Sequence, residues 1–198
     1  LKEEILFYKM LQYLFFKQWF CLKEYANQNG ISIIGDIPIY VAPDSADVWS
    51  EPKQFLLDKD LVPTAVAGCP PDAFSEEGQL WGNPLYNWDY MKRDNYSWWV
   101  KRMKFCEKLY DVVRIDHFRA FESYWAVPFG EVTARNGEWK KGPGMDLIKV
   151  FQKIAGDKLI IAEDLGDIDD NVRELVKKSG FWGMNVFQFG FFGDTKSN

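Results

Sequence analysis

The stretch 111–119, Asp-Val-Val-Arg-Ile-Asp-His-Phe-Arg, joins a short apolar run to a group of charged side chains. The valines and the isoleucine of this run are typical of a buried strand. The end of the strand carries a carboxylate, the only histidine of the chain and two arginines. Because ionised side chains are costly to bury unless they are paired, this density of charge predicts a site that faces water and a ligand. Alternatively, Arg114 and Asp116, on the same strand face, form an ion pair that only fixes the strand end.

Two further apolar runs also end in an acidic residue. The run 31–35 leads to Asp36, and the run 158–162 leads to Glu163. Such runs, separated by helical stretches, are typical of parallel strands covered on both faces, whose carboxyl ends lie on one side of the sheet. Asp36, Asp116 and Glu163 are therefore expected to converge on one rim. The pattern predicts an α/β fold: part of a (β/α)8 TIM-type barrel, with about four parallel strands, helices and long βα loops.

Apolar residues at helical spacing predict the elements between these strands. Helices are expected at 1–29, at about 95–110, at 145–155 and from about 171 to 180, and a further strand at 184–189. Charged residues interrupt the first helix, so it is not expected to span a membrane. No linker-like stretch divides the chain, which predicts a single, partial barrel domain over residues 1–198.

Residues 42–92 form a long connection that is rich in Pro, Gly, Asn and Trp. A connection of this length is usually functional, and its aromatic content argues against disorder. Its central side chains suit a sugar, since polar groups can bond hydroxyls and flat rings can pack on a pyranose: Asp72, Gln79 and Asn83, with Phe74 and Trp81. The sequence predicts a carbohydrate-binding loop region on the rim. The alternative is an Ω-loop whose aromatic residues fold inward.

Composition excludes several functional classes. The chain has 198 residues and a formal net charge of −5, which argues against nucleic acid as a partner. It has 9 Trp, 9 Tyr and 16 Phe, a content that fits a stacking surface as well as a core. Three widely spaced cysteines indicate neither a disulfide framework nor a zinc cluster, and they favour a reducing, cytoplasmic location. With a single histidine, no metal site is expected.

The acidic residues at the strand ends match the needs of glycosidic bond exchange. One carboxylate must attack the anomeric carbon, and a second carboxyl group must protonate the leaving oxygen. Asp116 and Glu163 are the candidates for these two roles, and Arg114 would stabilise the charge on Asp116. Glu163 has no comparable cation beside it in sequence, and a neighbouring acid such as Asp164 would help it to keep its proton.

Several segments resemble the amylomaltases, which are also called 4-α-glucanotransferases or disproportionating enzymes. The matching segments, in the order found in that family, are 33–41 with 44–49, 68–86, 114–119 and 161–166. The resemblance implies a retaining transfer of α-1,4-glucan segments between maltooligosaccharides. It implies that Asp116 is the nucleophile, that Glu163 is the acid/base and that Arg114 orients Asp116.

The same resemblance implies further substrate contacts. Asp36 and His117 are expected to bind hydroxyls of the glucan, and the segment 68–83 is expected to arch over the donor. Asp36 could instead be a buried residue that hydrogen-bonds the neighbouring strand end. Tyr40 is a further candidate for binding the glucan. At Ala73 the chain departs from family members that carry a bulky aromatic residue, which would weaken stacking at that point. No cofactor is implied. Two other functions stay open: a glucan hydrolase of the α-amylase type, and a glucan-binding module without turnover.

The number of strands leads to one more expectation. Four strand-like runs fall short of the eight of a closed barrel, and no motif after Gly166 matches the third carboxylate of the resembled family. We therefore expect a fragment that is inactive alone, with open sheet edges that favour self-association.

Overall fold

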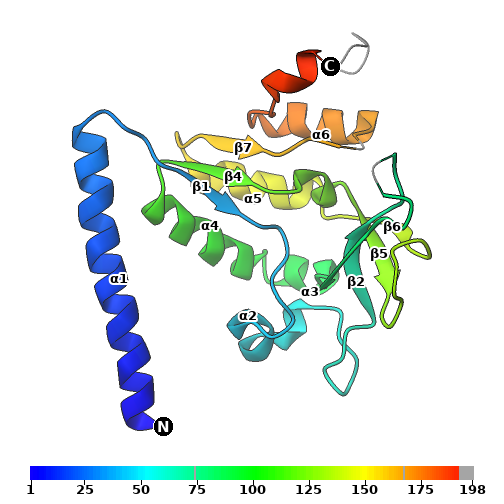
Figure 1. Ribbon diagram of the computed structural model, residues 1–198, viewed down its shortest axis with the longest axis horizontal. Coiled ribbons are helices and arrows are strands. Elements are labelled where there is room, and N and C mark those ends of the chain that lie inside the picture. The colour runs from blue at the N-terminus through cyan, green and yellow to red at the C-terminus, as the bar shows by residue number, and fades with distance from the viewer. Residues whose placement is uncertain (74, 167, 192–198) are drawn as a thin grey trace.

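The structure is a computed structural model that describes residues 1–73, 75–166 and 168–191 (Figure 1). The elements, in chain order, are α1 (Lys2–Gln28), β1 (Ile34–Ile37), α2 (Ala46–Ser50), the 3₁₀ helix η1 (Pro52–Gln54), β2 (Ala65–Cys69), β3 (Gln79–Pro84), α3 (Trp88–Arg93), α4 (Ser97–Leu109), β4 (Val112–Ile115), η2 (Phe118–Phe121), β5 (Ser123–Pro128), β6 (Glu138–Lys141), α5 (Met145–Ala155), β7 (Ile160–Ala162), α6 (Asp170–Ser179) and η3 (Phe187–Phe191).

The three apolar runs form a parallel sheet, as the sequence predicts. In the described part of the chain its strand order is β1-β4-β7, with β4 in the centre. Burial alternates along β1 and β4, so Ile37 and Ile115 are buried while Ile34 is 61% exposed. The expectation that these strands are covered on both faces is therefore wrong for the described residues. Helices cover one face only, and the other face carries the charged side chains of the site.

The covered face of the sheet forms the main core. The apolar sides of α4, α5 and α6 pack against it, and their buried side chains include Trp99, Met103, Leu147, Ile148, Phe151, Val172, Leu175 and Val176. Gly35 of β1 fits this packing, because a Cβ at that position would lie 1.9 Å from the ring of Tyr110. The helix predicted at 145–155 has the observed bounds of α5.

A second sheet replaces the long rim loops expected from the sequence. Its strands are antiparallel in the order β3-β2-β5-β6, among the described residues (Figure 1). Two of them, β2 and β3, lie inside the 42–92 segment, and β5 and β6 lie in the later segment 121–144. Local patterns did not reveal these strands within the expected loop region, because β2 pairs with β5 across a long stretch of sequence.

The strand expected at 184–189 is also absent from the described residues. Trp182 makes a single parallel bridge to Ile161 of β7, and the chain then turns into η3. The pairing stops there because the next available backbone donor, the N–H of Met184, bonds Oδ1 of Asp164 at 2.7 Å. The side chain of Asp164 thus accepts the N–H that would otherwise have continued the pairing with β7.

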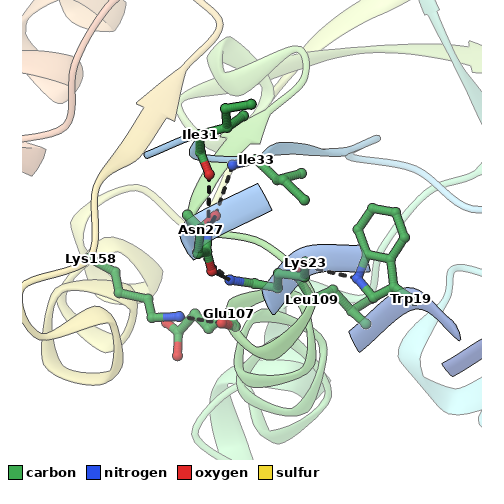
Figure 2. Close-up of polar contacts among 9 residues, drawn as sticks. Trp19, Lys23, Asn27, Ile31, Ile33, Glu107, Leu109 and Lys158 are labelled. Atoms are coloured by element: carbon green, nitrogen blue, oxygen red, sulfur yellow. Dashed lines mark hydrogen bonds and ion pairs between the residues drawn. The ribbon is translucent and has the colours of Figure 1, made fainter. Parts of the chain in front are cut away.

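Helix α1 lies apart from the two sheets and meets the rest of the chain through its C-terminal half (Figure 1). The predicted helix is present, but no residue of this fully described helix is buried. Figure 2 shows part of its attachment, in which Trp19 Nε1 donates to the carbonyl of Leu109 at 3.0 Å. In addition, Lys23 and Asn27 bond the carboxylate of Asp111. The same carboxylate accepts the N–H of Ile33 at 2.8 Å. One side chain at the start of β4 thus joins α1 to the sheet.

No helix in the parts of the chain that the structure describes combines the length and the apolar character that a membrane crossing requires.

Replacing Asp111 by Asn should lower the free energy of unfolding at pH 7 by about 1–2 kcal/mol. Burial alone would raise the pKa of Asp111, but the donors from Ile33, Lys23 and Asn27 lower it from 3.8 to about 2. A lowered pKa stabilises the folded state above the unfolded value, and this stabilisation is lost as the pH falls from about 4 towards 2.

Urea titrations at several pH values measure this difference. The variant and the unmodified chain should converge in stability as the pH falls through about 2, where Asp111 becomes protonated in the folded chain. The exposed Asp157→Asn is the matched control and should change stability little at any pH. A deficit in Asp111→Asn that is independent of pH would contradict the role of the carboxylate charge.

Candidate active site

The ends of β1, β4 and β7 bring the predicted acidic residues to one rim. Asp36 of β1 is in register with Arg114 of β4. Backbone hydrogen bonds continue past the strands, from the N–H of Asp116 to the carbonyl of Ile37 at 2.9 Å and from the N–H of Glu163 to that of Ile115 at 3.0 Å. These backbone bonds fix the positions of Asp116 and Glu163 independently of any side-chain contact.

Arg114 is the centre of the charged group. Its Nη1 lies 2.7 Å from Oδ1 of Asp36, and its Nη2 lies 2.7 Å from Oδ1 of Asp116. The Arg114–Asp116 ion pair expected from the spacing is present. The side chains of Asp36 and Asp116 remain 59% and 44% exposed. Carboxylates with this exposure can still reach a ligand, so the arrangement does more than fix a strand end.

A third contact of Arg114 was not foreseen from the sequence. Its Nε donates to Sδ of Met184 at 3.2 Å. Met184 is held in turn by Asp164, which accepts its backbone N–H. Gly183 lies close to the same carboxylate, and a Cβ there would be 2.7 Å from Oδ2 of Asp164. The local sequence does not reveal this contact, because the alternation of residues in 184–189 predicts a strand there.

Glu163 sits in a different environment from Asp116. Its Oε2 accepts the N–H of His117 and its Oε1 accepts the N–H of Leu165, both at 2.9 Å. Burial raises the pKa of Glu163 above its ordinary value, the two N–H donors oppose this, and the negative charge of Asp116 raises it further. The acidic neighbour that acts on Glu163 is therefore Asp116, whereas Asp164 is engaged with Met184.

His117 connects this group to the second sheet. Its backbone is in the left-handed region, with φ of 52°, where the chain turns from β4 into η2. Its ring meets the ring of Trp81 edge to face, with the centroids 4.8 Å apart. Burial and the nearby charge of Arg119 lower the pKa of His117 to about 4. The imidazole is therefore neutral at pH 7 and can both donate and accept a hydrogen bond.

Trp81 of β3 places an aromatic surface next to the acidic residues. It is 36% exposed, and its Nε1 donates to Oε1 of Gln79 at 3.1 Å. Tyr40 packs near it, with the ring centroids 6.2 Å apart. The ring of Trp81 is thus neither buried in its own segment nor remote from the strand ends, so the Ω-loop alternative is wrong for this residue.

The remaining predicted residues make contacts within the fold. Tyr40 is buried and stacks on Tyr86, with the centroids 5.8 Å apart. Asn83 donates from Nδ2 to the carbonyl of Val41 at 2.9 Å, which ties β3 to the segment after β1. Asp72 Oδ1 accepts the N–H of Ser75 at 2.8 Å, as in a turn. Phe74 lies outside the described residues.

The donor atoms do not suggest a metal centre. Within residues 1–73, 75–166 and 168–191, no group of three or more His, Cys, Asp or Glu side chains could hold a metal ion.

The site combines two different carboxyl groups: Asp116 is exposed and bound by Arg114, and Glu163 is more buried and has a raised pKa. Two carboxyl groups whose environments differ in this way can serve as attacking group and proton donor.

Comparisons with known proteins show which proteins this chain is similar to. The family described as 4-alpha-glucanotransferase matches residues 1–198. A curated 4-alpha-glucanotransferase of Clostridium butyricum is 57% identical over 198 residues, covering 100% of this chain and 41% of the relative. One from Streptococcus pneumoniae is 51% identical over 197 residues, covering 100% of this chain and 39% of the relative. This chain thus spans about two fifths of the length of the curated relatives that it matches.

A solved structure gives the same result. The amylomaltase of Streptococcus agalactiae in complex with acarbose is 50% identical and superposes with a TM-score of 0.89. The match covers 94% of this chain and 38% of that structure. The similarity therefore extends to the arrangement of the elements as well as to the sequence.

Proposed function

The chain belongs to the 4-alpha-glucanotransferase family, and on that premise we propose that Asp116 and Glu163 are the catalytic pair of a transferase. The proposed enzyme transfers α-1,4-glucan segments between maltooligosaccharides and retains the anomeric configuration. The observation that supports this most is the contrast between the two carboxyl groups. Asp116 is exposed and paired with Arg114, while Glu163 is partly buried and has a raised pKa. This is the division of roles that a retaining glycosidic exchange requires.

In the first step of the proposed reaction, an Oδ atom of Asp116 bonds to the anomeric carbon as the bond from that carbon to the leaving glucan breaks. Glu163 gives its proton to the leaving oxygen. In the second step, the 4-hydroxyl of an acceptor glucan attacks the same carbon, gives its proton to the Glu163 carboxylate and releases Asp116. Two inversions give net retention.

Arg114 is proposed to hold the attacking group in position. It bonds Asp36 and Asp116 at the same time, so the two carboxylates are fixed relative to each other. The second oxygen of each accepts no hydrogen bond from the described residues, and Asp36 can accept a hydrogen bond from a sugar hydroxyl. The imidazole of His117, which is neutral at pH 7 and meets the ring of Trp81, suits a second hydroxyl.

We also propose that the parallel sheet is part of a (β/α)8 barrel. The uncovered face of β1 and β4 carries Ile34, Asp36 and Arg114. In a barrel this face lines the interior, and the acidic residues lie at the carboxyl ends of the strands, where barrel enzymes have their active sites.

Incubation with maltotriose tests the proposed function in the whole protein that carries this chain. Transfer gives a ladder of longer and shorter maltooligosaccharides, which chromatography resolves. Shorter products alone would indicate a hydrolase, and no change in the presence of measurable binding would indicate a binding module. Either of these two results would refute the transferase assignment.

Trp81→Ala is expected to raise the KM for maltotriose about three- to tenfold, because a flat ring that packs on a sugar face is lost. The catalytic pair is untouched, so kcat should fall less than KM rises. Steady-state transfer kinetics measure both. Phe129→Ala, which removes a ring that is 55% exposed in the turn after β5, is the matched control and should leave KM unchanged. Equal KM values for the Trp81 variant and the unmodified protein would rule out stacking at this ring.

A further inference from the structure

A cavity lies apart from the acidic pair, and neither Asp116 nor Glu163 lines it. It has a volume of about 290 Å³ and lies where β6, η2 and the start of α6 meet. Its walls include Arg119, Trp139, Asp169 and Asn171. The volume is near the lower end of the roughly 300–1,000 Å³ that is usual for small-molecule sites. A cavity of this size can take one sugar unit of a longer chain.

The aromatic ring in the cavity is held firmly. The guanidinium of Arg119 lies 4.0 Å from the ring centroid of Trp139, and Trp125 meets the same ring edge to face at 5.2 Å. Arg119 itself is only 5% exposed, and its Nη2 is 3.3 Å from Oγ of Ser123. Trp139 nevertheless remains 40% exposed. A fixed, partly open indole next to polar groups is suited to the C–H face of a pyranose.

The charges around the cavity favour a neutral ligand. Nη2 of Arg119 lies 3.9 Å from Oδ2 of Asp169. Lys141 is paired with Glu122, and Lys140 lies 2.5 Å from Glu138. Because each of these cations already has a carboxylate partner, an anion gains little by binding here. The same carboxylates, with the amide of Asn171, can bond the hydroxyls of a neutral sugar.

We propose that this cavity is an auxiliary binding site for one glucosyl unit of an α-1,4-glucan chain, stacked on Trp139. The proposal rests on the proposed function for the identity of the sugar. The segments that carry the catalytic groups continue into the cavity, since Arg119 follows shortly after His117 and Asp169 follows shortly after Glu163. A long glucan bound here stays close to the enzyme between transfers.

The test follows tryptophan side chains in the ¹⁵N-labelled chain by NMR. The Asp116→Asn background prevents turnover, and the indole N–H signals of Trp139 and Trp81 are assigned from Trp139→Phe and Trp81→Phe. Maltotriose should shift the Trp139 signal in a saturable manner, and inorganic phosphate at the same concentration should not. A Trp139 signal that does not move at saturating maltotriose, or that moves equally with phosphate, would overturn the proposal.

Two variants sharpen the result. Asn171 lies at an exposed position in α6. Asn171→Ala should weaken the affinity for maltotriose, measured from the Trp139 signal, about three- to tenfold, because one hydrogen bond to the sugar is lost. Phe129→Ala should leave that affinity unchanged, and an equal loss in both variants would overturn the site. The Trp81 signal reports separately on the proposed catalytic groove. If maltotriose leaves the Trp81 signal unmoved and the whole protein with Asp116 intact shows no transfer, the proposed function is wrong. The response of the Trp139 signal is read independently of both results.

Discussion

Replacing Asp116 by Asn is expected to lower the initial rate of transfer from maltotriose on the order of 10⁴-fold or more. The amide cannot form the covalent bond to the anomeric carbon, so the double displacement has no first intermediate. The fold should be retained, because Arg114 keeps its ion pair with Asp36 and its contact with Met184. The rate is measured by chromatography of the maltooligosaccharide products, with the whole protein that carries this chain.

Two controls make this outcome decisive. Asp157→Asn removes a carboxylate from an exposed position outside the site and should retain full activity. Thermal unfolding of Asp116→Asn should match that of the unmodified protein to within a few degrees. If the variant keeps normal turnover, then Asp116 is not the nucleophile.

Replacing Glu163 by Gln should lower transfer from maltotriose about 10³-fold, within the range that general acid–base catalysis contributes. The variant retains Asp116 and can still form the glucosyl-enzyme from a donor that needs no proton. With α-maltosyl fluoride, whose fluoride leaves unprotonated, we expect a burst of fluoride about equal to the enzyme concentration, followed by slow turnover. Asp116→Asn should give no burst with the same donor, which separates the two roles.

The pH dependence supplies an independent check on Glu163. A general acid works while it is protonated, so activity should decrease as the pH rises through the pKa of Glu163. Burial and the charge of Asp116 raise that pKa, which keeps the acid form available at a higher pH than for an ordinary glutamate. With the fluoride donor this alkaline decrease should disappear from the burst step. An alkaline limb that persists in Glu163→Gln would assign it to another group.

The local sequence was enough to find the main elements of the parallel sheet. The runs that end in Asp36, Asp116 and Glu163 carry their own signal, because a buried strand needs consecutive apolar residues and its end can carry charge. The amphipathic helix α5 has the predicted bounds for a similar reason. The Arg114–Asp116 contact follows from two-residue spacing on one strand.

Elements that depend on distant partners were not found in this way. The strands of the second sheet were not predicted from the sequence, because β2 is short and is stabilised by its pairing with the distant β5. The position of Trp81 beside His117 follows from that sheet. The strand expected near Met184 is missing from the described residues because Asp164 binds the backbone donor that the strand would use.

By itself the sequence determined which residues could do chemistry, because a strand end, an acid and a cation two residues apart are local features. The tertiary structure alone decided how their environments differ. Glu163 has a raised pKa because the fold buries it beside Asp116, and Arg114 is held at a third point by Met184, which is distant in sequence. Burial and electrostatic neighbours are properties of packed elements, so they appear only when β1, β4 and β7 come together.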